Sequence, residues 1–241
     1  IVPMLLALLF GSAMRRKISS IFGKGWAKTL LLFLGVKVRV FGKNDFKSKG
    51  VFFASNHLSY IDILVLYSRF RVVFVSKHDV KKWPIIGLLA KYVGTIFINR
   101  SHKSKAKEYV TQITQLLKKR INVLFFPEGT SSSGENILPF KSSLFEAPIE
   151  TRGDIQPVFL EYESINGEKV DSKTRDKICW YGDIDFKKHV LDFLNFKSVT
   201  SNIYLAPIIE NSKYLNLNRK LLSETTYKAI SDIKEKVNST S

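Results

Sequence analysis

The sequence predicts an α/β fold: a single domain with a central, largely parallel mixed sheet flanked by helices. From residue 36 onward, short apolar runs of strand composition alternate with helical patterns, and no Pro-, Gly- or Ser-rich linker divides the chain. The 241 residues, 45% of them hydrophobic, are enough to build one large core. We expect one domain over residues 36–241, preceded by a membrane-associated helical segment over residues 1–35.

Two apolar stretches bordered by basic residues make up the first 35 residues. Ile1–Phe10 is shorter than the about 20 residues that a membrane span needs, so it is the end of a spanning helix, a signal-peptide remnant or an interfacial helix. Arg15, Arg16 and Lys17 follow the run, which argues against a signal peptide and favours a cytoplasmic position for the rest of the chain. Trp26–Leu34 predicts either a helix in the lipid headgroup region or an ordinary core helix.

The remaining elements follow from hydrophobic periodicity. The predicted strands are Val36–Phe41, Val51–Ala54, Val72–Val75, Thr95–Ile98, Val123–Phe126, Ile155–Glu161, Ile178–Tyr181 and Val199–Ala206. The predicted helices are Tyr60–Ser68, Pro84–Tyr92, Ser101–Lys119, Ser142–Ile149, Phe186–Asn195 and Glu224–Val237. Proline lacks the backbone N–H that a sheet ladder needs, so Pro157 predicts an edge strand.

Charge and cysteine content narrow the kinds of partner. Lysine and arginine outnumber aspartate and glutamate by 38 to 21, a formal net charge of +17, which indicates an anionic partner. RNA-binding signatures are absent, and basic residues beside apolar segments fit an anionic membrane surface better than nucleic acid. A non-catalytic basic module that binds membrane or nucleic acid is the alternative class. A single cysteine, Cys179, excludes an intramolecular disulfide and fits a reducing compartment.

The heptad Asn56-His57-Leu58-Ser59-Tyr60-Ile61-Asp62 lies where a buried strand gives way to a helix. This placement lets His57 and Asp62 meet. A histidine whose Nδ1–H is held by a carboxylate presents Nε2 as a proton acceptor near neutral pH. The pair therefore predicts a general base that acts on a hydroxyl brought by the substrate; a hydrogen-bonded structural histidine is the alternative.

Two further clusters follow predicted strands, where sites in α/β folds are built. Arg100 ends the strand before the helix 101–119, a position from which it could clamp a phosphate group. Phe126-Pro127-Glu128-Gly129-Thr130 forms a tight turn that presents backbone N–H groups and the Glu128 side chain, and Gly129 permits close approach to a ligand.

Together these motifs resemble the glycerolipid acyltransferases of the 1-acyl-glycerol-3-phosphate acyltransferase family, bacterial type. Asn-His-x-x-x-x-Asp, Gly-x-x-Phe-x-x-Arg, Phe-Pro-Glu-Gly-Thr and an apolar-Pro-Val strand occur in the family's order between about residues 36 and 210. Lys77 falls where the family carries a lysine near the acceptor phosphate. Ser131 stands where many members have arginine, and Lys141 is the residue that could supply the missing charge, although lysine is the less directional anion ligand.

The resemblance implies transfer of a fatty acyl group from acyl-CoA or acyl-carrier protein to the free sn-2 hydroxyl of 1-acyl-glycerol-3-phosphate. His57 and Asp62 would be catalytic, and Lys77, Arg100, Glu128, Gly129, Thr130 and Lys141 would bind the acceptor. No metal or cofactor is expected, and the expected location is the cytoplasmic face of the inner membrane. Lyso-ornithine lipid or glycerol-3-phosphate is the alternative acceptor. Ser59 lacks a nucleophile elbow, so an acyl-enzyme on this residue is not expected.

Overall fold

The computed structural model describes residues 12–43, 50–82, 87, 90, 94–99, 105–213 and 218–240. Four of the expected features lie wholly or mostly outside these ranges. They are the apolar run Ile1–Phe10, most of the helix predicted over Pro84–Tyr92, Arg100 and the first four residues of the helix predicted from Ser101. The rest of the predicted α/β architecture can be compared element by element.

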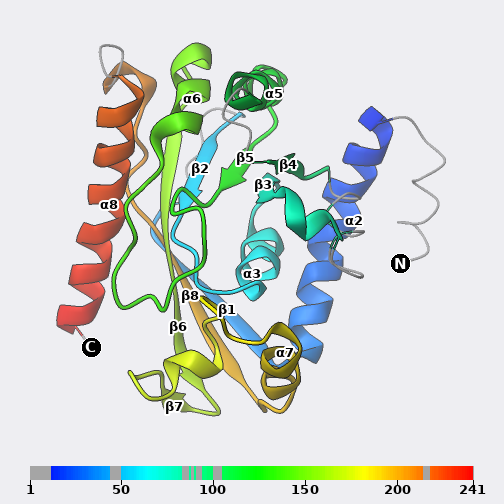
Figure 1. Ribbon diagram of the computed structural model, residues 1–241, viewed down its shortest axis with the longest axis vertical. Coiled ribbons are helices and arrows are strands. Elements are labelled where there is room, and N and C mark those ends of the chain that lie inside the picture. The colour runs from blue at the N-terminus through cyan, green and yellow to red at the C-terminus, as the bar shows by residue number, and fades with distance from the viewer. Residues whose placement is uncertain are drawn as a thin grey trace.

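Eight strands among the described residues form one mixed sheet, as the sequence predicts (Figure 1). They are β1 (Val36–Phe41), β2 (Phe52–Ser55), β3 (Val73–Lys77), β4 (Ile96–Ile98), β5 (Val123–Phe125), β6 (Ile155–Ile165), β7 (Glu168–Lys169) and β8 (Val199–Leu205). The order is β1-β8-β6-β2-β5-β3-β4, with β7 paired to β6. Pairing is parallel except for β6 with β7 and β8. The carboxyl ends of β2, β5 and β3 therefore meet at one edge of the sheet.

Helices pack on both faces of this sheet (Figure 1). They are α2 (Ser12–Phe33), α3 (Ile61–Arg69), α5 (Ala106–Lys118), α6 (Glu146–Thr151), α7 (Phe186–Leu194) and α8 (Arg219–Thr240). Helix α8 begins five residues before the predicted start, because the Asn218 side chain accepts the backbone N–H groups of Lys220 and Leu221 and so caps the helix. In the described ranges, no helix combines the length and the apolar character that crossing a membrane requires.

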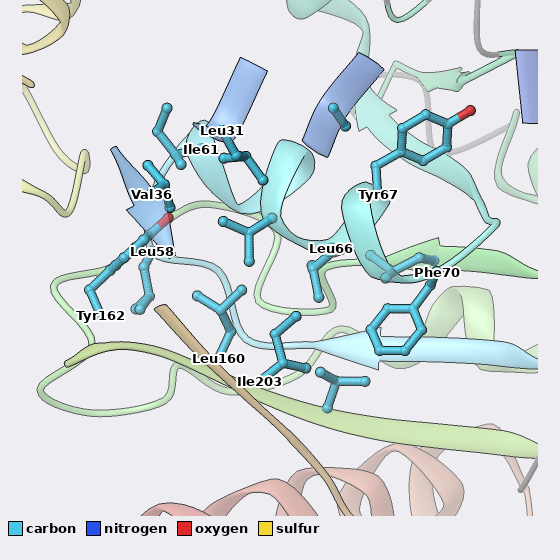
Figure 2. Packing of buried hydrophobic residues seen from close by; sticks show 14 of the residues in the cluster. Leu31, Val36, Leu58, Ile61, Leu66, Tyr67, Phe70, Leu160, Tyr162 and Ile203 are labelled. Carbon is cyan, nitrogen blue, oxygen red and sulfur yellow. The ribbon is translucent and has the colours of Figure 1, made fainter. Parts of the chain in front are cut away.

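The alternation of side chains along the strands sends neighbouring residues to opposite faces of the sheet, where they join different hydrophobic cores. Phe53 and Leu124 point to the core beneath α2, α3 and α7, whereas their neighbours Phe52 and Val123 point to the core beneath α5 and α6. Figure 2 shows the first of these cores, in which α2 contributes Leu31 against α3 and the sheet. The opposite side of α2 leaves Leu32 and Phe33 77% and 82% exposed.

The prediction that Pro157 marks an edge strand is wrong. Strand β6 lies inside the sheet, between β2 and β8. The Pro157 carbonyl accepts the Ala206 N–H at 3.1 Å, while the buried side-chain amide of Gln156 donates to the Ala206 carbonyl at 2.8 Å. Gln156 thus supplies the donor that proline lacks, which makes an interior proline tolerable.

The strand predicted over Ile178–Tyr181 is also wrong. The segment is a turn in which the backbone N–H groups of Ile178 and Cys179 both donate to the Arg175 carbonyl. Both side chains are buried in the core beneath α3. Their apolar character therefore reflects burial of an irregular segment, not pairing in the sheet. The Trp180 N–H donates to the Leu58 carbonyl at 2.9 Å. This bond ties the turn to residues 56–60 between β2 and α3, the His57 loop.

Candidate active site

His57 lies in the connection between β2 and α3, at the edge where β2 and β5 end side by side. Phe126 directly follows β5, and its ring stacks on the His57 imidazole with centroids 3.9 Å apart and planes 12° apart. The stacked ring fixes the plane of the imidazole. The His57 side chain remains 19% exposed, so one edge of the ring is accessible.

The predicted contact between His57 and Asp62 is present. His57 Nδ1 lies 2.7 Å from Asp62 Oδ2, and the Asp62 side chain is fully buried. The same oxygen accepts the backbone N–H groups of Leu58 at 2.7 Å and Ser59 at 3.0 Å. Because a carboxylate accepts and Nδ1 donates, Nε2 carries the lone pair and can take a proton.

A fourth donor reaches Asp62 from a distant strand. The hydroxyl of Tyr162 on β6 donates to Asp62 Oδ1 at 2.6 Å, across 100 positions of sequence. Asn56 joins the same two parts of the chain: its side-chain amide donates to the Leu160 carbonyl at 2.8 Å and accepts the Leu160 N–H at 2.7 Å. Both carboxylate oxygens of Asp62 thus have partners, as a buried charge requires.

Glu128 is buried beneath the His57 loop, with 3% of its surface exposed. One carboxylate oxygen accepts the backbone N–H of His57 at 2.6 Å, and the other accepts that of Leu138 at 2.8 Å. Burial raises the pKa of Glu128 to about 7, against the lowering effect of these two N–H groups. Both oxygens face backbone donors, so in this geometry Glu128 holds the His57 loop in place.

A cavity of about 290 Å³ opens beside the His57 ring. Its lining includes His57, Tyr60, Phe126 and Trp180, together with three of the residues predicted to bind the acceptor: Lys77, Gly129 and Thr130. Lys77 forms an ion pair with Asp79, which also lines the cavity, at 3.0 Å; both side chains are 62% exposed. The structure therefore brings the His57 imidazole, a pair of opposite charges and a glycine turn to one cavity.

Lys141 lies elsewhere. It lines a neighbouring cavity of about 430 Å³ with Asn99 and Tyr109, and Phe126 forms part of the wall of both cavities. Ser131, at the position where arginine was expected, lines the cavity of His57 instead. Arg100 lies outside the described residues, directly after Asn99. Among the residues that the structure describes, no three histidine, cysteine or carboxylate side chains gather to hold a metal ion.

Comparison with known proteins assigns the class. The chain belongs to the acyltransferase family, whose model matches residues 37–161, and it is an O-acyltransferase. The resemblance to glycerolipid acyltransferases that the motifs indicate is thereby confirmed. Membership of an enzyme family also argues against the alternative of a non-catalytic binding module.

Two relatives of known activity are similar to this chain. The chain is 34% identical over 216 residues to the lyso-ornithine lipid O-acyltransferase of Rhizobium meliloti, covering 86% of this chain and 74% of that protein. It is 34% identical over 120 residues to the 1-acyl-sn-glycerol-3-phosphate acyltransferase of Neisseria meningitidis, but spans only 47% of that protein and 50% of this chain.

The fold has a solved counterpart. The crystal structure of the 1-acyl-sn-glycerophosphate acyltransferase PlsC from Thermotoga maritima matches with a TM-score of 0.67. The match covers 97% of this chain and 87% of that one, at 18% sequence identity. This likeness confirms the predicted fold class, a mostly parallel mixed sheet flanked by helices.

Proposed function

We propose that this protein transfers a fatty acyl group from acyl-CoA or acyl-carrier protein to the sn-2 hydroxyl of 1-acyl-glycerol-3-phosphate, giving phosphatidic acid. The observation that carries the proposal is His57, whose Nδ1 is held by a buried carboxylate with four donors while its ring borders a cavity. Among the described residues, no serine hydroxyl hydrogen-bonds to the His57 ring. Such a base acts on a hydroxyl that the substrate supplies.

The proposed reaction is a direct transfer. His57 Nε2 removes the proton from the acceptor hydroxyl as its oxygen attacks the thioester carbonyl. The tetrahedral intermediate collapses, the carbon–sulfur bond breaks, and the leaving thiolate takes the proton from the imidazolium. Asp62 stabilises the imidazolium between the two steps. Positioned general-base action of this kind contributes about 10²–10⁴-fold to the rate.

The acceptor headgroup would lie against Lys77 and the turn at Gly129 and Thr130. Gly129 has φ of +83°, a conformation that favours glycine, so its backbone turns sharply beside the cavity. Anchoring the headgroup there would fix which hydroxyl faces His57. Arg100 and Lys141 remain proposed acceptor ligands; Lys141 would have to act from the neighbouring cavity, which shares Phe126 as a lining residue. For Glu128, its two backbone partners favour a positioning role over direct contact with substrate.

Lyso-ornithine lipid is the second candidate acceptor. Its headgroup carries an ammonium and a carboxylate, and the Lys77–Asp79 pair offers one partner for each charge. Ser131, in place of arginine, removes one cation that a phosphate headgroup would use. The relative from Rhizobium meliloti is named for this acceptor.

An acceptor panel distinguishes the two candidates. Purified protein is incubated with radiolabelled acyl-CoA or acyl-carrier protein and, separately, 1-acyl-glycerol-3-phosphate, lyso-ornithine lipid and glycerol-3-phosphate, and the products are separated by chromatography. We expect labelled phosphatidic acid. Labelled ornithine lipid alone would replace the acceptor and keep the chemistry, whereas no transfer to any acceptor would contradict the proposal.

We also propose that the protein works at the cytoplasmic face of the inner membrane. The exposed Leu32 and Phe33 at the end of α2 and the exposed Leu191 and Leu194 on α7 form the proposed contact. The carboxyl-terminal ends of α2 and α7 are close to each other. The carbonyl of Gly35, just after α2, accepts the N–H of Val199, which lies five residues beyond the end of α7. Apolar side chains in a strongly basic protein fit an anionic bilayer surface.

Flotation with anionic vesicles tests this contact. Replacing Leu32 and Phe33 together by aspartate should weaken vesicle binding at least about tenfold, because both apolar burial and charge attraction are lost. Leu221→Asp, a matched change at an exposed leucine on α8, should leave binding unchanged. Equal binding by both variants, or tight binding to oligonucleotides without affinity for vesicles, would contradict the proposed surface.

A further inference from the structure

We propose that Tyr162 is a positioning residue for the acyl transfer: its hydroxyl holds Asp62 Oδ1 and so sets the angle at which Asp62 presents Oδ2 to His57. The proposal rests on the proposed role of His57 as the base. It adds a residue from β6, far from the His57 heptad in sequence, to the catalytic arrangement.

The hydrogen bonds of Asp62 divide between its two oxygens. Oδ2 takes the donors of the heptad itself, namely His57 Nδ1 and the backbone N–H groups of Leu58 and Ser59. Oδ1 accepts a hydrogen bond from the Tyr162 hydroxyl at 2.6 Å. The two oxygens turn together about the Cβ–Cγ bond, so a donor on Oδ1 resists any rotation that would move Oδ2 away from its three donors. Tyr162 therefore helps to hold the direction of the Asp62–His57 hydrogen bond.

Tyr162 is itself held precisely. Its residue is 5% exposed, and it lies beside Leu58 in the core beneath α3, where Figure 2 shows it. Two residues earlier on the same face of β6, Leu160 is bound through both backbone groups by the Asn56 side chain. The pairing of β6 with β8 shifts its register directly after Tyr162. A bulge at this point re-aims the strand, and the Asn56 clamp fixes where the strand lies before it.

The charges around Asp62 make Tyr162 a constant donor. Burial and the negative charge of Asp62 raise the pKa of Tyr162 well above its ordinary value, so the phenol keeps its proton. Burial likewise raises the pKa of Cys179 to about 12 and that of Tyr60, and both stay neutral. Glu128 also interacts with Asp62, and burial raises the pKa of Glu128 to about 7.

The change Tyr162→Phe removes the hydroxyl and little else. Oδ1 then loses its donor, and more of the negative charge of Asp62 acts on the His57 imidazolium. We expect kcat/KM to fall about tenfold, the order expected for a hydrogen bond to a charged group, with the KM for the lyso-lipid little changed. The acid limb of the kcat/KM pH profile should move to higher pH, by about 0.5 to 1 unit.

The matched control is Tyr204→Phe. Tyr204 lies on the neighbouring strand β8, and its hydroxyl donates to the carboxylate of Glu161 on β6 at 2.9 Å. This variant should keep the parent pH profile. A second substitution guards against loss of folding: 3-fluorotyrosine at position 162 keeps the shape but makes the phenol a stronger donor. It should move the acid limb in the opposite direction, to lower pH.

Failure of the inference on Tyr162 can be distinguished from failure of the proposed function. A lower melting temperature for Tyr162→Phe with the parent pH profile, or no opposite shift with 3-fluorotyrosine, would mean that Tyr162 is structural and would overturn this inference alone. Retention of activity by His57→Ala would instead remove the proposed function on which the inference rests.

Discussion

Replacing His57 by alanine is expected to lower kcat/KM for acyl transfer by about 10²–10⁴-fold, because the acceptor hydroxyl then has no positioned base. The measurement is the rate of labelled acyl transfer to the lyso-lipid identified in the acceptor panel. Alanine also removes the ring that stacks on Phe126 and leaves Asp62 without its Nδ1 partner. Thermal unfolding of the variant must therefore accompany the rate.

His57→Gln separates the loss of the base from damage to the site. The glutamine amide can still donate a hydrogen bond towards Asp62, but it cannot take a proton near neutral pH. We expect the two variants to lose activity to a similar extent, with His57→Gln the more stable. A glutamine variant that retained most of the parent rate would show that His57 holds the loop without acting as a base.

The second large effect is expected for Asp62→Asn. An amide has nearly the same shape as the carboxylate but no charge, so it cannot stabilise the imidazolium that forms when His57 takes the proton. We expect kcat to fall by up to about 10⁴-fold, the loss that the same change causes in a serine-protease triad. The KM for the lyso-lipid should change little, since Asp62 is fully buried.

A control for this change exists on the surface of the same protein. The hydroxyl of Tyr181 donates to the Asp176 carboxylate at 2.6 Å, an exposed tyrosine–aspartate pair with the same chemistry as the Tyr162–Asp62 pair. Asp176→Asn should leave kcat within about twofold of the parent, as surface substitutions usually do. If Asp62→Asn were equally harmless, the His57–Asp62 pair would not be the proton acceptor.

What the sequence predicted well depends on local spacing. Asp62 is five residues from His57, and both flank the start of α3, so a strand followed by a helix is enough to bring them together. Lys77 is the last residue of β3, and Gly129 and Thr130 lie shortly after β5. The carboxyl ends of these strands lie at the same sheet edge, so parallel pairing brings the three residues to the His57 cavity.

What the sequence did not predict depends on contacts between distant segments. Tyr162 carries no local signal for its contact with Asp62, since the hydrogen bond requires β6 to lie beside β2 in a particular register. Phe126 could have been found as the last apolar residue before the Pro127 turn, but its stacking on His57 depends on the pairing of β2 with β5. Pro157 alone predicts an edge strand, because the substitute donor of Gln156 becomes visible only in the folded sheet.

The two cavities also explain why the ligand for the acceptor headgroup was difficult to predict. Lys141 and Lys77 are both basic and both lie near Phe126, yet they line different hollows. Sequence spacing cannot show which of two neighbouring cavities a side chain will line. The charge that replaces the expected arginine at Ser131 therefore has to be identified by the acceptor panel together with Lys77→Ala and Lys141→Ala.

The central claim is that the acceptor hydroxyl attacks the thioester directly, with His57 as its base. Intact-protein mass spectrometry after incubation with the acyl donor alone, followed by addition of lyso-lipid, tests it most directly. We predict no acyl adduct before the lyso-lipid is added and product formation afterwards, in keeping with a Ser59 side chain that is fully buried. A stable acyl adduct on Ser59 or another residue that passes its acyl group to the added lyso-lipid would contradict the account.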